Sequence, residues 1–147
     1  MRPISTKTHG ILDYVSSATL FVLPRALHWD KSLTTAVTGV ALNTLSVSAM
    51  TRYEAGLLKV IPMKTHLALD CVTGISLATL PFLFLDADNR KPGTIGTLLG
   101  LGAFEIAAAF LTQTRSSIEQ PEQVADKNLL KRLDNMRKQG LKEVFAH

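Results

Sequence analysis

Two copies of a histidine–aspartate motif are the residues in this chain best suited to chemistry. Residues 7–13 read KTHGILD and residues 64–70 read KTHLALD. Residues four positions apart lie on one face of an α-helix, so His9 pairs with Asp13 and His66 pairs with Asp70. Imidazole and carboxylate groups together can bind a transition metal or exchange protons.

The similarity between the two copies extends well beyond the motif. Residues 7–24 and 64–81 are identical at nine of 18 positions, without a gap, at an offset of 57. In the second helix of each unit the same offset matches only Gly39 with Gly96 and Leu42 with Leu99. Self-similarity at a fixed spacing indicates a duplicated structural unit. We therefore expect two tandem units, at about residues 7–56 and 64–113.

Four apolar segments must position these motifs, at about residues 10–28, 33–50, 65–85 and 94–113. Each has close to the roughly 20 residues that a helix needs to cross a bilayer. A soluble helical bundle would need a charged face on each helix, yet residues 33–50 contain no ionisable side chain. The sequence predicts an all-α fold, in which residues 1–113 form a four-helix transmembrane bundle of two tandem helical hairpins.

The last 34 residues differ in composition. The chain is 46% hydrophobic and 19% charged, but residues 1–113 hold 16 charged side chains and residues 114–147 hold 12. Apolar residues recur there at helical spacing among basic ones, at Leu129, Leu130, Leu133, Met136, Leu141 and Val144. This pattern predicts a cytoplasmic amphipathic helix, which either rests on anionic lipid or is solvated or packed on a partner protein.

The Lys/Arg count predicts the orientation. With four spans, one side collects 12 basic residues and the other side four. The positive-inside rule then places both termini in the cytoplasm. Because topology explains the basic charge, nucleic acid is not an expected partner. No cleavable signal peptide is visible, and the single cysteine, Cys71, excludes an internal disulfide.

Two tandem units of two helices, with Pro24 and Pro81 late in the first helix of each, resemble the bacterial SPW-repeat membrane proteins. Where that family has Ser-Pro-Trp, this chain has Leu23-Pro24-Arg25 and Leu80-Pro81-Phe82. The resemblance implies a multi-pass protein of the bacterial inner membrane with no established activity. A proline near a helix end is most simply a kink or a terminator.

The intramembrane polar residues form the candidate site. Placing a carboxylate near the bilayer centre costs on the order of 3 kcal/mol of free energy. Because this cost occurs at two equivalent positions, we expect Asp13 and Asp70 to find polar partners on the other repeat. Thr8 and Thr65 are expected to cap the two helix starts. The remaining candidates reach a similar depth, which gives a cluster of His9, Asp13, Asn43, His66, Asp70 and Glu105.

Two functions follow. The preferred one is a small membrane scaffold or interaction protein with no enzymatic activity and no cofactor, whose His/Asp pairs dock the hairpins. The alternative is a metal-binding protein (Zn, Mn or Fe) or a proton- or solute-handling protein, using His9, Asp13, His66, Asp70 and Glu105. Gly96 and Gly100 form a small-xxx-small face, which indicates close packing with another helix, a membrane-protein partner or a second copy.

Overall fold

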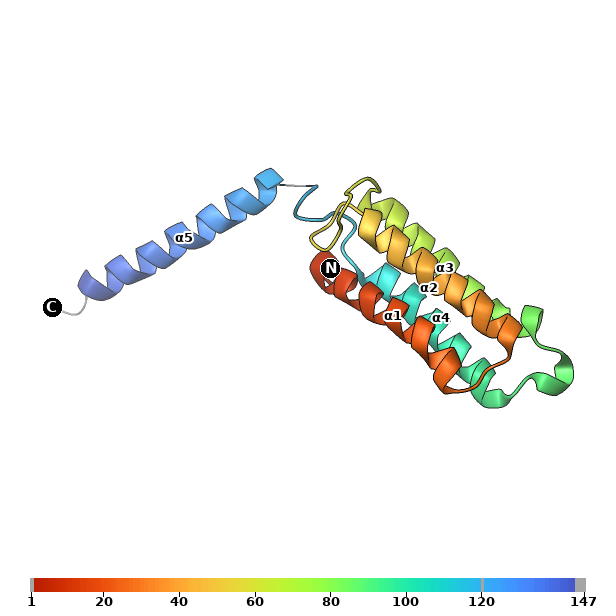
Figure 1. The fold of residues 1–147 in the computed structure, drawn as a ribbon. Coiled ribbons are helices and arrows are strands. Elements are labelled where there is room, and N and C mark those ends of the chain that lie inside the picture. Colours follow the sequence, from red (N-terminus) through yellow and green to blue (C-terminus); the bar gives the residue numbers. More distant parts are fainter. Residues whose placement is uncertain (1, 120, 145–147) are drawn as a thin grey trace.

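The chain is helical along most of its length in a computed structural model that describes residues 2–119 and 121–144 (Figure 1). The long helices are α1 (Thr6–Ala26), α2 (Lys31–Met50), α3 (Met63–Phe84), α4 (Pro92–Leu111) and α5 (Pro121–Val144), and η1 (Ala87–Asn89) is a short 3-10 helix. The four apolar segments correspond to α1–α4, and each helix begins and ends within four residues of its predicted bounds. The described residues contain no strand, so the all-α prediction is confirmed.

Helices α1–α4 lie side by side, each running opposite to the helix before it, whereas α5 projects away from them (Figure 1). The principal contacts are between α3 and α4, between α1 and α2, and between α2 and α3. Consequently α1 and α3 begin at the same end of this helical body, and α2 and α4 end there.

Two isolated β-bridges tie that end together. Ile4 pairs with Thr112, and Ile61 pairs with Thr51. The Ile4 amide donates to the Leu111 carbonyl at 3.1 Å, and the Ile61 amide donates to the Met50 carbonyl at 2.9 Å. The start of α1 is thereby held beside the end of α4, and the start of α3 beside the end of α2.

The first helices of the two halves and the second helices of the two halves are separated by different numbers of residues. Helices α1 and α3 begin 57 residues apart, whereas α2 and α4, each of 20 residues, begin 61 residues apart. The joint containing η1 accounts for most of the difference. Counted from the helix ends, Thr51 corresponds to Thr112, and Gly39 corresponds to Gly100 rather than to Gly96.

Three of the helices, α2, α3 and α4, are long and apolar enough to cross a membrane. Helix α1 is long enough, with 21 residues, but Lys7, His9 and Asp13 lower its hydropathy. Among the described residues, the sequence prediction of four spans is therefore supported for three helices.

The outside of the helical body is apolar, and part of its interior is polar. Large apolar side chains on all four helices point outward, including Ile11, Val15, Val22, Leu42, Val72, Ile75, Leu83, Leu99, Phe104 and Phe110. Polar side chains fill the interior near the starts of α1 and α3, and an apolar core fills the opposite half, made of Leu20, Leu33, Val37, Ala41, Leu77, Leu80, Leu85 and Leu98. An apolar exterior of this extent favours contact with lipid.

The small residues that pack closely are not the predicted ones. A Cβ added at Gly96 or Gly100 would meet nothing within 4 Å, so neither glycine packs against another helix of this chain. The close approach is instead at Gly74 and Gly102, where a Cβ on Gly74 would lie 2.6 Å from the Gly102 carbonyl oxygen. Gly96, Gly100 and Gly102 all belong to α4, and the rotation of α4 about its axis decides that Gly102 is the one that faces α3.

The predicted helix caps were also wrong. Ser5 caps α1, with its hydroxyl accepting the Thr8 amide at 3.1 Å, and Pro62 precedes α3 without a side-chain cap. Thr8 and Thr65 therefore lie inside the first turns. Pro24 and Pro81 lie within their helices, which end two and three residues later, at Ala26 and Phe84.

The segment after α4 packs back on the helical body. The Ser116 side chain is 1% exposed, and its hydroxyl donates to the Arg52 carbonyl at 2.6 Å. Residues 114–119, assigned to the tail from sequence, thus contact the α2–α3 joint. The tail helix forms as α5, with Leu129, Leu130, Leu133 and Met136 exposed. The side chains of Leu141 and Val144 lie outside the described part.

Candidate metal centre

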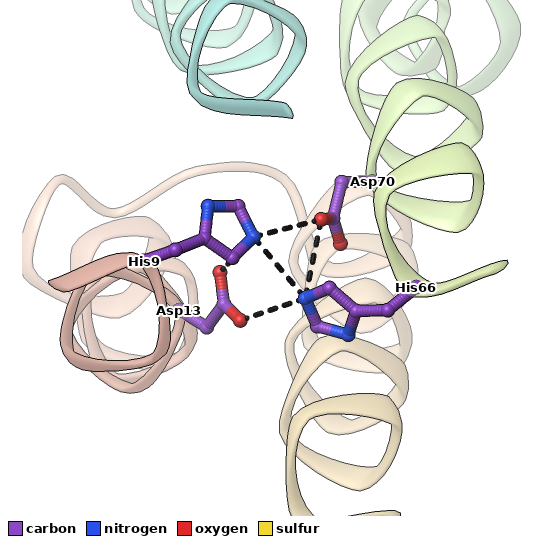
Figure 2. Close-up of side chains that lie close together, drawn as sticks. All are labelled: His9, Asp13, His66 and Asp70. Atoms are coloured by element: carbon purple, nitrogen blue, oxygen red, sulfur yellow. Dashed lines mark hydrogen bonds and ion pairs between the residues drawn. The ribbon is translucent and has the colours of Figure 1, made fainter. Parts of the chain in front are cut away.

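Four buried side chains converge between α1 and α3. Figure 2 shows His9 and Asp13 of α1 pointing toward His66 and Asp70 of α3. All four, here called the His/Asp cluster, are at most 3% exposed. Each offers one ligand atom, and the four atoms lie within 4.8 Å of one another.

The shortest contacts in the cluster cross between the helices. His9 Nε2 lies 3.0 Å from Asp70 Oδ2, and His66 Nε2 lies 3.0 Å from Asp13 Oδ2. The contacts within each helix are longer, at 3.4 Å from His9 to Asp13 and 3.2 Å from His66 to Asp70. The two Nε2 atoms are 3.2 Å apart. Each imidazole therefore faces the carboxylate of the other helix as well as its own.

The opposite nitrogen of each imidazole is held by a threonine. His66 Nδ1 lies 2.9 Å from Thr51 Oγ1, and His9 Nδ1 lies 2.9 Å from Thr112 Oγ1. Both threonines follow the last residue of a helix, and the β-bridges place each beside the start of the helix that carries its histidine. The threonines are fully buried.

These contacts determine which ring nitrogen carries the hydrogen. Each threonine hydroxyl also donates to the carbonyl oxygen four residues earlier, at 2.7 Å for Thr51 and 2.6 Å for Thr112. A hydroxyl has one hydrogen to donate, so it must accept from the imidazole. His9 and His66 therefore both carry hydrogen on Nδ1, and a neutral ring presents a bare Nε2 lone pair to the cluster.

The cluster consequently requires positive charge at its centre. Two lone pairs and two carboxylates at 3.0–3.4 Å repel one another unless a cation or added protons lie among them. One divalent ion would balance the two carboxylates. Two protons on the Nε2 atoms would balance them equally, as two crossed imidazolium–carboxylate pairs.

Most of the separations are close to those of tetrahedral coordination. Metal bonds of about 2.0–2.1 Å to nitrogen and oxygen imply ligand atoms roughly 3.3 Å apart in a tetrahedron. Five contacts, which involve both carboxylate oxygens of Asp13, range from 3.0 to 3.4 Å, and the four ligand atoms all lie within 4.8 Å of one another. The two carboxylates would therefore have to move toward an ion held by all four groups.

One carboxylate has an additional donor. The Ser48 hydroxyl donates to Asp13 Oδ2 at 2.8 Å. The residue 61 positions later is Ala109, which has no hydroxyl to offer Asp70. The two halves of the site therefore match in their histidines, aspartates and threonines but differ at this donor.

Two other residues predicted to belong to the cluster, Glu105 and Asn43, are not among its four converging side chains. Glu105 is 2% exposed, hydrogen-bonds Ser16 and interacts electrostatically with three of the four cluster side chains, but it is not among the converging ligand atoms. Asn43 is exposed, so its predicted place in the cluster was wrong; its neighbour Thr44 faces the interior. The hydroxyls of Thr44 and Ser17 are buried without a hydrogen-bond partner in the described residues.

The loop after α2 covers this end of the body. Tyr53 is fully buried against Gly10, its ring centre 5.6 Å from that of His66, and burial raises the pKa of its phenol above the usual value. For Glu54, burial acts to raise the pKa, but hydrogen bonds from the Ser117 and Thr6 hydroxyls outweigh it. The pKa of Glu54 is therefore lowered, and its carboxylate joins α1 to the segment after α4.

Thr51, Thr112 and Ser48 were not identified from the sequence. A signal for the threonines was present, because aligning the second helices at an offset of 61 pairs Thr51 with Thr112. Ser48 has no counterpart in the other half, so only its contact with Asp13 identifies it.

Comparisons of the chain with protein-family models, with curated proteins and with solved structures found no match. The resemblance to SPW-repeat proteins therefore stays a prediction.

Proposed function

We propose that this chain is an integral membrane protein that binds one divalent transition-metal ion at the His/Asp cluster. The observation that carries the proposal is the contact of each Nδ1 atom with a threonine hydroxyl that also donates to a carbonyl, from which we infer that both Nε2 atoms face the two carboxylates without hydrogen. Histidine ligands of metals usually donate their other N–H to a neighbouring acceptor, which sets the tautomer and the ring orientation.

The donor set narrows the choice of metal. Two imidazoles and two carboxylates suit zinc, iron or manganese, and the absence of a thiolate disfavours Cu(I). The short ligand separations favour zinc or a tetrahedral ferrous ion over larger ions.

The proposed setting is a four-helix bundle in the bacterial inner membrane, with both termini in the cytoplasm. Helix α1 contributes two of the four ligands and exposes Ile11, Val15 and Val22 on its outer face, as a fourth span would. The matching helix starts, cross-contacts and threonines support a duplicated hairpin, arranged about a pseudo-twofold axis along the membrane normal. The excess of basic residues at the cluster end supports a cytoplasmic location for that end.

A resident ion is favoured over an ion in transit. The half of the body away from the cluster is filled by an apolar core in which Leu33, Val37, Leu77 and Leu98 are fully buried. A path across the membrane would need polar groups or water along its whole length. The ion would therefore enter and leave from the cytoplasmic end.

A second candidate is a scaffold in which the same residues only dock the hairpins. The crossed contacts from His9 to Asp70 and from His66 to Asp13 favour it, because they join α1 to α3 whether metal or protons supply the charge. The two candidates differ in what occupies the centre of the cluster.

Elemental analysis of protein purified in detergent tests whether the chain is a metal-binding protein or a scaffold. We expect about one zinc, iron or manganese ion per chain, lost in a His9→Ala/His66→Ala variant and retained in His28→Ala, since His28 is exposed at the other end of α1. Circular dichroism must show that the double variant is still helical; otherwise Asp13→Asn is the alternative. A wild-type chain that holds no more metal than the variant, even after incubation with each ion, would overturn the metal proposal and leave the scaffold.

A further inference from the structure

Two adjoining pockets at the cluster end of α3 and α4 form a second candidate site. The first, of about 330 Å³, is lined by Arg52, Pro62, Lys64, Thr114, Arg115 and Glu119. The second, of about 190 Å³, shares Lys64 and Thr114 and continues along Leu67, Ala68, Cys71 and Phe110.

The first pocket is suited to an anion. Among the described side chains that line it, Arg52 and Lys64 are basic and Glu119 is the acid. The Glu119 carboxylate is engaged by backbone amides, accepting from Met63 at 3.1 Å. The Arg52 guanidinium is held in place because its Nε donates to the Lys59 carbonyl at 2.8 Å.

The second pocket is suited to a hydrocarbon chain. Its apolar lining comes from α3 and α4, two of the helices that are long and apolar enough to cross a membrane. Ala68 and Phe110 are exposed there, whereas Leu67 is buried behind them. Arg2 also lines it, and that side chain donates to the Thr112 carbonyl at 2.9 Å. A polar, basic pocket thus leads directly into an apolar one at the level where the helices begin and end.

We propose that these two pockets bind one anionic phospholipid, with its phosphate headgroup at Arg52 and Lys64 and one acyl chain against Ala68 and Phe110. Basic pockets between helices on the cytoplasmic side of a membrane recognise such headgroups. A soluble anion would need only the first pocket, and the apolar continuation is the reason for choosing a lipid. The inference rests on the proposed membrane location but not on the metal.

Native mass spectrometry of the full chain in neutral detergent tests it, with phosphatidylglycerol and phosphatidylcholine of identical acyl chains as probes. We expect the wild type to prefer phosphatidylglycerol by at least tenfold. Arg52→Gln/Lys64→Gln should weaken its binding by about 30-fold. Lys7→Gln/Lys127→Gln is the matched control, because it removes the same charge from exposed positions outside both pockets and should bind like the wild type.

A separate variant distinguishes a lipid from a soluble anion. Ala68→Trp fills the apolar pocket without altering its charge, and it should reduce phosphatidylglycerol binding while inorganic phosphate fails to compete in the wild type. Equal binding of the two lipids, equal losses in both charge variants, or competition by phosphate would each overturn the proposal. A chain that remains monodisperse without detergent would refute the membrane location itself, whatever its metal content.

Discussion

Replacement of Thr51 by valine tests the reasoning about the imidazole tautomers directly. Valine preserves the shape of threonine but removes the oxygen that lies 2.9 Å from His66 Nδ1. Because His66 and Thr51 are both fully buried, water cannot easily take the place of the lost acceptor. The ring then loses the contact that sets its orientation.

The size of the effect follows from two independent considerations. An unsatisfied buried N–H costs about 1–3 kcal/mol, which corresponds to about 5- to 150-fold in an equilibrium constant. Loss of an outer partner of a metal-bound histidine typically weakens metal binding by about 10- to 100-fold. We therefore expect Thr51→Val to raise the Kd for Zn²⁺ by about 10- to 100-fold, and Thr112→Val to do the same through His9.

The assay is a competition titration of purified protein against a chelating indicator of known zinc affinity. Thr35→Val is the control, because the Thr35 hydroxyl on α2 also donates to the carbonyl four residues earlier, at 2.8 Å, and has no histidine among its hydrogen-bond partners. Thr51→Ser keeps the hydroxyl and should bind zinc nearly as the wild type does. Unchanged affinity in Thr51→Val, or an equal loss in Thr35→Val, would refute the assignment of the Nδ1 hydrogens.

Two further predictions concern stability, measured by thermal unfolding in detergent. Gly74→Ala should lower the stability of the protein by about 1–3 kcal/mol, because the new Cβ would lie 2.6 Å from the Gly102 carbonyl oxygen. Gly96→Ala, where an added Cβ meets nothing within 4 Å, should not lower it. Equal effects of the two substitutions would contradict this packing. Glu54→Gln should destabilise at pH 7, because the lowered pKa of Glu54 shows that the fold favours the ionised form. That contribution is present above the ordinary pKa of 4.5 and is lost as pH falls through the lower folded value, so a difference from wild type that persists in acid would contradict it.

The sequence by itself determined the properties that depend on neighbouring residues. The approximate bounds of α1–α4, the apolar character of α2, α3 and α4, and the placing of each His/Asp pair on one helical face follow from composition and from the spacing of four. The shared motif also indicates that Asp13 and Asp70 are related positions.

The tertiary structure decided which side chains meet, since that depends on how each helix is rotated and on which ends are joined. Successive residues differ by about 100° around a helix, so the interior position on α2 is Thr44 and not Asn43. The same rotation brings Gly102 rather than Gly96 against α3. The contact between Thr112 and His9 spans 103 residues and exists because a β-bridge joins the start of α1 to the end of α4. Local periodicity contains no information about such a contact.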